Sequence, residues 1–157
     1  GMWGKAIETL MRHLAMPTVT WAAERAASMR YIARCCDALG DWQSAAYWLE
    51  RAADEAPSQR EAPYALSLLY YRREDWALCR YWAMRALHIT ARDNNYMTEP
   101  EAWGAGPFDL MAISSWQLGL WEDAVAAAEK AVELEPGNER LQNNLKIMRC
   151  SHDSKSK

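Results

Sequence analysis

The sequence has little of what β-sheets and long loops require. Among its 157 residues are one Phe, few Val and Ile, 7 Gly and 6 Pro. Strands are enriched in β-branched residues, and Gly and Pro mark turns and loops. Half of the residues are apolar, and Ala and Met, which favour helices, are frequent. The composition therefore predicts one all-α domain with few irregular segments.

The sequence lacks the usual signals of several classes of function. The net charge of −3 leaves no basic surface for a nucleic acid, and no apolar run approaches the roughly 18 residues that a membrane span needs. The three histidines, His13, His88 and His152, share no motif, and no phosphate-binding glycine loop or nucleophile elbow occurs. We therefore expect no catalytic residue, no metal, no cofactor, and neither a nucleic acid nor a membrane as partner.

The four cysteines do not form a metal or redox motif. No two of Cys35, Cys36, Cys79 and Cys150 have the two-residue separation of such sites. Cys36 and Cys79 fall on the expected buried helical face, where a free thiol behaves as a small apolar side chain. This usage suits a reducing compartment and predicts a cytoplasmic protein.

Four of the nine tryptophans set the register of the chain. Trp42 and Trp76 lie 34 residues apart, which is the period of a tetratricopeptide repeat, a pair of antiparallel helices. Trp3 and Trp121 fit the same register if short insertions are allowed. A small residue follows each tryptophan after three positions: Ala6, Ala45, Cys79 and Ala124. We expect each tryptophan to open a second helix and each small residue to be buried where two helices touch.

The register divides the chain into seven segments. They are a half-repeat (2–17), repeats 26–59, 60–90 and 105–138, an insertion (91–104), a capping helix (139–150) and a disordered polar tail (151–157). Gly40 and Gly119 mark turns within repeats, and Leu141, Leu145 and Met148 give the capping helix one apolar stripe. The predicted fold is a right-handed α–α superhelix closed by a capping helix.

The half-repeat has two interpretations. It matches a second helix without its first, which suggests that the natural polypeptide continues upstream, or it is a simple packing helix. An apolar face with Trp3, Ile7, Leu10 and Leu14 lacks its repeat partner. We expect this face to pack on the first full repeat or to form a homodimer.

The insertion also has two interpretations. Loops of this length in compact domains are often functional, so its aromatic residues Tyr96 and Trp103 are candidate ligand contacts. Alternatively, it is a solvated connector in which both aromatics fill the gap between repeats.

A second resemblance is more specific than the repeat pattern. Met29 to Cys35, Arg60 to Pro63, Leu69 to Tyr71 and above all Glu99-Pro100-Glu101-Ala102-Trp103-Gly104 resemble the repeat region that follows the catalytic domain in some bacterial and phage family-2 glycosyltransferases. The resemblance implies a non-catalytic module of a sugar-transferring protein. Its partners would be a glycosyltransferase domain or a glycan.

The first helices of such repeats line an inner groove. This implies candidate ligand contacts at Arg30, Arg34, Asp37, Tyr64, Leu68, Tyr71, Arg72, Asp109 and Trp116. Arg30 and Arg34 lie one turn apart and fit a carboxylate or phosphate, while the aromatics fit peptide side chains or sugar rings. Alternatively, the arginines pair with Asp37 and Glu61, and the aromatics fill a narrow groove.

The expected function is a scaffold that binds a protein or peptide. Chaperone-binding relatives hold a peptide C-terminus with a clamp of basic and Asn side chains. Here Ala65, Gly106 and Leu110 occupy clamp positions, so that clamp is not expected. The alternative function is an accessory module of a glycosyltransferase that orients the enzyme or engages its acceptor.

Overall fold

The computed structural model describes residues 1–92 and 95–155, and over these residues it contains helices and no strand. This confirms the all-α prediction. The helices are α1 (Met2–Ala15), α2 (Ala22–Ala38), α3 (Trp42–Glu55), α4 (Glu61–Arg72), α5 (Trp76–His88), α6 (Pro100–Trp103), α7 (Gly106–Gln117), α8 (Trp121–Leu134) and α9 (Glu139–Lys155).

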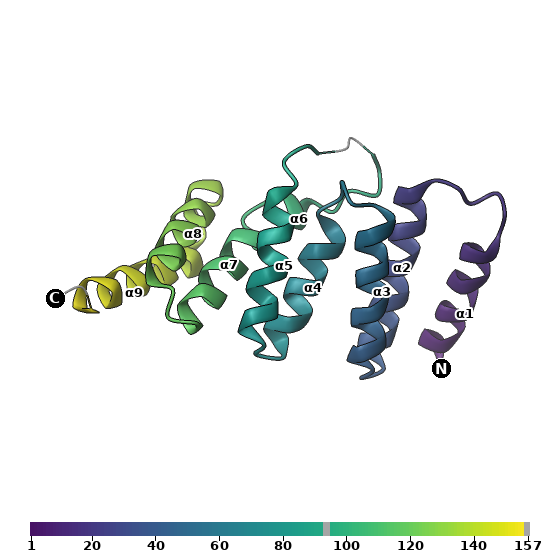
Figure 1. The fold of residues 1–157 in the computed structure, drawn as a ribbon, viewed down its shortest axis with the longest axis horizontal. Coiled ribbons are helices and arrows are strands. Elements are labelled where there is room, and N and C mark those ends of the chain that lie inside the picture. Colours follow the sequence, from purple (N-terminus) through teal and green to yellow (C-terminus); the bar gives the residue numbers. More distant parts are fainter. Residues whose placement is uncertain (93–94, 156–157) are drawn as a thin grey trace.

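The helices stack in one elongated row with the two termini at opposite ends (Figure 1). Three hairpins make up most of the row: α2 with α3, α4 with α5, and α7 with α8. Helix α1 packs on α2 at one end, and α9 packs on α8 at the other. The insertion lies along one edge of the row, between α5 and α7, and contains the one-turn helix α6.

The turn inside each hairpin explains where the second helix begins. Gly40 and Gly119 have φ of 82° and 76°, in the left-handed region that glycine adopts without strain. The second hairpin places Glu74 there at φ 58°. Next, the carboxylate of Asp41 caps α3 by accepting from the backbone N–H of Ser44 at 3.0 Å. The expected tryptophan then opens each second helix, in α3, α5 and α8.

The core consists mainly of small residues. Ala45 and Ala124, three positions after Trp42 and Trp121, are 1% and 0% exposed, which confirms that these two small residues lie at close helix contacts. Ala6, at the same position after Trp3, is only partly buried. Cys36 and Cys79 are buried as expected. Burial raises the pKa of both thiols, so they remain protonated packing groups.

Two helices extend beyond the segments inferred from the sequence. Helix α2 begins at Ala22, before the predicted start of the first repeat at residue 26. Helix α9 continues to Lys155, so residues 151–155, assigned to a disordered tail, have a helical backbone here. No Pro or Gly interrupts the chain between Glu139 and Lys155 to end the helix. Residues 156 and 157 lie outside the described residues.

Helix α1 packs on the first hairpin through one side only. Ile7, Leu10 and Leu14 are partly buried against the main core, as one of the two expectations for this helix required. Trp3, however, remains 49% exposed and Met2 85% exposed. An apolar strip of α1 therefore faces solvent at the end of the row.

Candidate ligand-binding groove

The insertion is fixed to the hairpins by a buried arginine. Arg30 of α2 is 3% exposed. Its guanidinium donates to Glu99 at 3.3 Å, to the backbone carbonyl of Met97 at 3.0 Å and to Gln59 at 3.4 Å. With its donors engaged inside the protein, Arg30 is not accessible to a ligand, although the sequence made it a candidate contact.

Glu61 supplies a second buried attachment point. One of its carboxylate oxygens accepts from the indole N–H of Trp103 at 2.8 Å and from the backbone N–H of Glu99 at 3.1 Å. The guanidinium of Arg60 lies over the Trp103 ring, 4.4 Å from its centroid. Trp103 thus fills space between the insertion and α4, as the connector interpretation expected.

The alternative interpretation, in which the protein's own carboxylates pair with Arg30 and Arg34, named the wrong carboxylates. Arg30 and Arg34 both pair with Glu99 of the insertion, and not with Asp37 and Glu61. Asp37 pairs instead with Arg72, at 2.7 Å. The sequence offered no measure of distance between residues 30 and 99, so the pairing across the insertion was not foreseen.

Tyr96 does not fill a gap between repeats. It is 78% exposed, and its ring touches that of Trp21 with centroids 5.5 Å apart. It stays a candidate ligand contact at the edge of the array. Asp93 and Asn94 of the same insertion lie outside the described residues.

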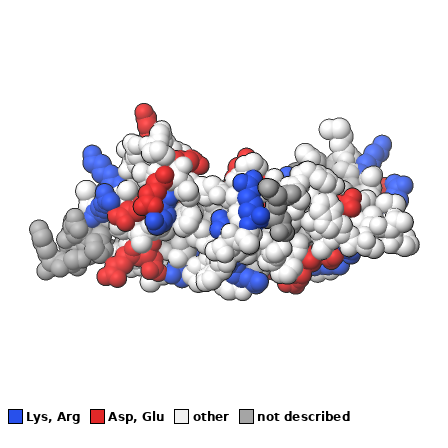
Figure 2. Space-filling view, turned by 90° about the horizontal axis from the view of Figure 1, so that it is seen from above, with Lys and Arg blue, Asp and Glu red and all other residues white. Residues whose placement is uncertain are grey.

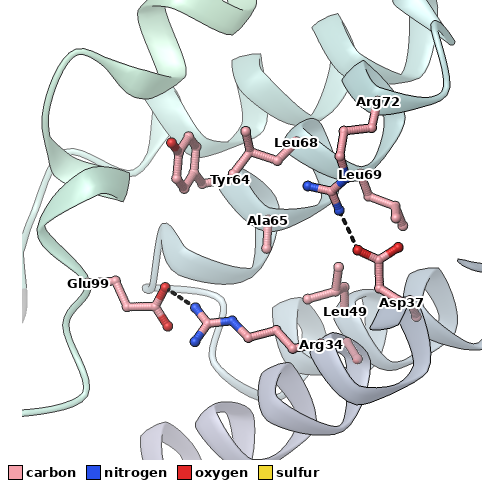
Figure 3. A pocket seen from close by; sticks show the side chains of 11 residues that line it. Arg34, Asp37, Leu49, Tyr64, Ala65, Leu68, Leu69, Arg72 and Glu99 are labelled. Carbon is pink, nitrogen blue, oxygen red and sulfur yellow. Dashed lines mark hydrogen bonds and ion pairs between the residues drawn. The ribbon is translucent and has the colours of Figure 1, made fainter. Parts of the chain in front are cut away.

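A pocket of about 130 Å³ opens between α2 and α4, and we call it the α2–α4 pocket. Figure 3 shows its two walls: Arg34 with Glu99 on one side, and Asp37 with Arg72 on the other. Leu68 and Tyr64 approach from α4. Five of the candidate residues line this pocket: Arg34, Asp37, Tyr64, Leu68 and Arg72.

The walls of the α2–α4 pocket are charged and its floor is apolar. Arg34 donates to Glu99 at 2.5 Å and is 53% exposed. Leu49 and Leu69 are buried beneath the pocket, beside the small side chains of Ala33 and Ala45. Such a site accepts an apolar side chain, while the paired charges at its rim offer donors and acceptors to the flanking backbone.

Two further pockets are lined by residues of α4, α7 and α9. Tyr64 and Asp109 line one of about 130 Å³. The other, of about 310 Å³, is lined by Tyr71, Ile113, Trp116, Gln117, Arg140, Asn144, Ile147 and Met148. Tyr64 is shared by the first two pockets and Arg140 by the last two. We call the three together the groove, and every candidate first-helix residue except Arg30 lines it.

Close packing shapes the middle of the groove. A Cβ atom on Gly106 would lie 2.6 Å from the Tyr64 hydroxyl, so only glycine fits there without displacing the ring. Burial, and then the nearby carboxylates of Glu101 and Asp109, raise the pKa of Tyr64, which keeps the phenol protonated. Asp109 is itself bound by Arg140 of α9 at 2.8 Å.

Sequence reasoning missed Glu99 and the contribution of α9. Glu99 belonged to the stretch that carries the glycosyltransferase resemblance, yet it was not a candidate contact. Its position directly before Pro100, which opens α6, was the available signal, because proline fixes the direction of the preceding residue. Asn144 and Ile147 were assigned to a cap and carried no signal for a groove.

Charges of both signs are spread over the visible surface (Figure 2). Figure 2 shows acidic and basic side chains interspersed along the visible face, without an extended basic area. Within the described residues, no helix is both long and apolar enough to cross a bilayer. In the same part of the chain, no three His, Cys, Asp or Glu side chains gather as metal ligands would.

Comparison with known proteins shows similarity of fold at low sequence identity. No family model and no curated protein sequence matches the chain. Among solved structures, the first TPR of Spaghetti (RPAP3) bound to an HSP90 peptide matches with a TM-score of 0.69 and 17% identity, over 83% of this chain and 95% of that one. The first TPR domain of human RPAP3 matches with a TM-score of 0.69 and 17% identity, over 85% and 97%.

A third match extends over nearly the whole chain. The structure named MamA MSR-1 C2 has a TM-score of 0.68 and 15% identity, and covers 98% of this chain and 79% of that one. Identities this low establish the fold and nothing beyond it. The chain therefore has the fold of a tetratricopeptide-repeat domain: an all-α, right-handed superhelix of helix pairs.

Proposed function

We propose that this protein is a non-catalytic scaffold that holds a peptide segment of a partner protein in the groove. The observation that carries the proposal is the α2–α4 pocket, in which an apolar floor lies between two charged walls. A peptide with one large apolar side chain and neighbouring acidic residues matches it. The apolar side chain would enter the pocket, and the carboxylates would compete with Glu99 for Arg34.

The first structural neighbour supports peptide binding as a class of function. That repeat domain is bound to an HSP90 peptide, SRMEEVD. That peptide combines Met with acidic residues, so it is a useful first probe here. A chaperone clamp is not proposed, because Ala65, Gly106 and Leu110 stand at positions where basic or amide side chains would be needed.

Filling the α2–α4 pocket is expected to weaken peptide binding. Ala65 lines the pocket and is only half-buried, so Ala65→Leu places three more carbons in the space that the peptide side chain needs. We expect the affinity for a labelled SRMEEVD peptide to fall about tenfold, which corresponds to about 1.4 kcal/mol. Arg34→Gln, which removes one exposed charge contact, should cost about fivefold. Fluorescence anisotropy measures both.

The matched control is Ala77→Leu. Ala77 is exposed on α5 and lines none of the three groove pockets, so this variant should bind like the wild type. Equal affinities for the wild type and Ala65→Leu would exclude the α2–α4 pocket as the binding site. Tyr96, the exposed aromatic residue of the insertion, would then be the leading candidate for the ligand contact.

Membership of a glycosyltransferase remains a second proposal. It is supported by the likeness of residues 99–104, which in this structure contain α6 and anchor the insertion on Arg30 and Glu61. On this proposal the groove or the insertion engages the enzyme or its glycan acceptor in a bacterial cytoplasm. A glycosyltransferase domain encoded upstream in the same reading frame would establish it, and an unrelated upstream region would exclude it.

We also propose that α1 mediates self-association. Met2, Trp3 and Met11 are exposed on this helix, and a second copy of the chain would cover them. Sedimentation velocity should show a mass that rises with protein concentration. Trp3→Gln should shift the equilibrium toward the monomer, since it removes the largest exposed ring of α1. A wild-type protein that stays monomeric at high concentration would contradict this proposal.

A further inference from the structure

A five-residue pattern occurs twice in the outer helices and is not used by the groove. Tyr47-Trp48-Leu49-Glu50-Arg51 in α3 and Tyr81-Trp82-Ala83-Met84-Arg85 in α5 are 34 residues apart, so they occupy the same position in successive hairpins. We call Tyr47, Trp48, Arg51, Tyr81, Trp82 and Arg85 the aromatic–arginine patch. The third hairpin has Ala126, Ala127 and Lys130 instead, so the patch spans two repeats.

The two halves of the patch have the same geometry. Tyr47 and Trp48 meet edge to face with centroids 5.5 Å apart, and Tyr81 and Trp82 do so at 5.1 Å. The guanidinium of Arg51 lies 5.8 and 5.1 Å from the centroids of its two rings. The corresponding distances for Arg85 are 6.0 and 5.2 Å. The pattern therefore specifies a cation held over a pair of rings, once in each repeat.

These two arginines lack the carboxylate partners that most others have. Arg25, Arg30, Arg34, Arg72, Arg80, Arg140 and Arg149 all form ion pairs with residues of other helices or of the insertion. Within residues 1–92 and 95–150, whose side chains the structure describes, Arg51 and Arg85 form no ion pair, and Arg85 has a long hydrogen bond of 3.4 Å to the Tyr81 hydroxyl. Their charge is held in place by aromatic rings and is not neutralised.

Stacking leaves the guanidinium able to bind a carboxylate. A cation–π contact engages the face of the aromatic ring, and it does not use up the N–H donors of the guanidinium, which form the fork that matches a carboxylate. Stacking also restricts the side chain before a ligand arrives, which lowers the entropy lost on binding. Arg51 and Arg85 are therefore oriented donors at fixed positions on the surface.

A hollow beside Arg85 provides further room for an anionic group. Arg85 and His88 line a pocket of about 260 Å³ between the ends of α3 and α5, and Ala53, Pro57, Pro63 and Ile89 complete it. None of these six lining residues is acidic. His88 donates from Nδ1 to the carbonyl of Met84 at 2.8 Å, which orients its other ring nitrogen away from that bond.

We propose that the aromatic–arginine patch is a second binding surface, separate from the groove, for an acidic segment of a partner protein. Carboxylates of that segment pair with Arg51 and Arg85, and its apolar atoms rest on the exposed rings of Tyr47 and Tyr81, which are 54% and 47% exposed. Tyr and Arg are the residues that contribute most to protein interfaces. With two such cations in a chain of net charge −3, a protein segment fits better than a nucleic acid, whose affinity grows with the number of phosphates neutralised.

The test uses a labelled 21-residue peptide with Glu at every third position, and the same peptide with Gln in place of Glu. We expect the full chain to bind the Glu peptide and not the Gln peptide in fluorescence anisotropy at low salt. The double variant Arg51→Gln/Arg85→Gln should bind the Glu peptide about tenfold more weakly. The variant Arg51→Lys/Arg85→Lys keeps the charge but loses the fork of N–H donors. Its affinity for the Glu peptide should lie between those of the wild type and of Arg51→Gln/Arg85→Gln.

Two control variants show whether binding requires this patch in particular. Arg73→Gln removes a guanidinium that also stacks on a tryptophan, 4.0 Å from the Trp42 ring, but lies outside the repeated pattern. Arg34→Gln changes the groove. Arg73→Gln should bind the Glu peptide within twofold of the wild type, Arg34→Gln shows how much of the same peptide binds in the groove instead, and circular dichroism should show all variants folded. The proposal would be overturned if Arg34→Gln lowered the affinity for the Glu peptide and the double variant did not. It would also be overturned if an alginate oligomer bound the protein more tightly than the Glu peptide does.

Discussion

Replacement of Arg30 by methionine is expected to lower the free energy of unfolding by about 3 kcal/mol. Arg30 is 3% exposed, and its guanidinium binds Glu99, Gln59 and the carbonyl of Met97. Removing one partner of a buried ion pair leaves the remaining polar groups without their hydrogen bonds, which costs about 3–5 kcal/mol. The lower end applies because Glu99 is 28% exposed and keeps Arg34. Urea denaturation followed by circular dichroism measures the change.

The same variant should release the insertion. Residues 97 and 99 are held to α2 through Arg30, so trypsin should cut after the exposed Arg92 faster than in the wild type. Arg34→Met is the matched control, because it breaks the other contact to Glu99 at a side chain that is 53% exposed. Exposed ion pairs contribute about 0.2–1 kcal/mol. If Arg30→Met and Arg34→Met lost the same stability, the burial of Arg30 would not make its contacts more stabilising than those of the exposed Arg34.

The hairpins of the fold could be predicted because their signals are local. Two local features recur where the second helices begin: a left-handed residue, such as Gly40 or Gly119, and the tryptophan two positions later. Helices α3 and α5 add a capping aspartate, whereas α8 begins after Leu120 without a side-chain cap. The small residue one turn later then sets the close contact between helices. Each of these effects acts within a few residues, so one sequence is enough to locate it.

The groove was predicted less well because its geometry depends on long-range contacts. Arg34 and Glu99 are separated by 65 positions, and nothing in the spacing of charges indicates that the insertion folds back onto α2. A turn-rich segment could equally have remained in solvent. The partners named for Arg30 and Arg34 in the alternative interpretation were therefore wrong, although Arg34, Tyr64 and Leu68 do line a pocket.

The buried face of the capping helix could be predicted from the sequence, but its contribution to a pocket could not. Leu141, Leu145 and Met148 are buried against the array, as their spacing indicated. The polar positions between them gave no sign that Asn144, together with Ile147 and Met148, would line a pocket with Tyr71 and Trp116. Periodicity identifies the face of a helix that is buried, but it does not show which neighbours the other faces approach.

Replacement of Ala124 by leucine is expected to cost about 1–3 kcal/mol of folding free energy, because extra carbons in a close-packed contact force helices apart. Ala124 is 0% exposed in the core between α7, α8 and α9. It is a sharper test of the register than Ala45, which lines the α2–α4 pocket and has space beside it.

Ala126→Leu on the exposed side of the same helix controls for helix propensity and should leave stability within about 0.5 kcal/mol of the wild type. Thermal and urea unfolding measure both variants. An Ala124→Leu protein as stable as its control would mean that the small residue after each tryptophan does not set the distance between the helices.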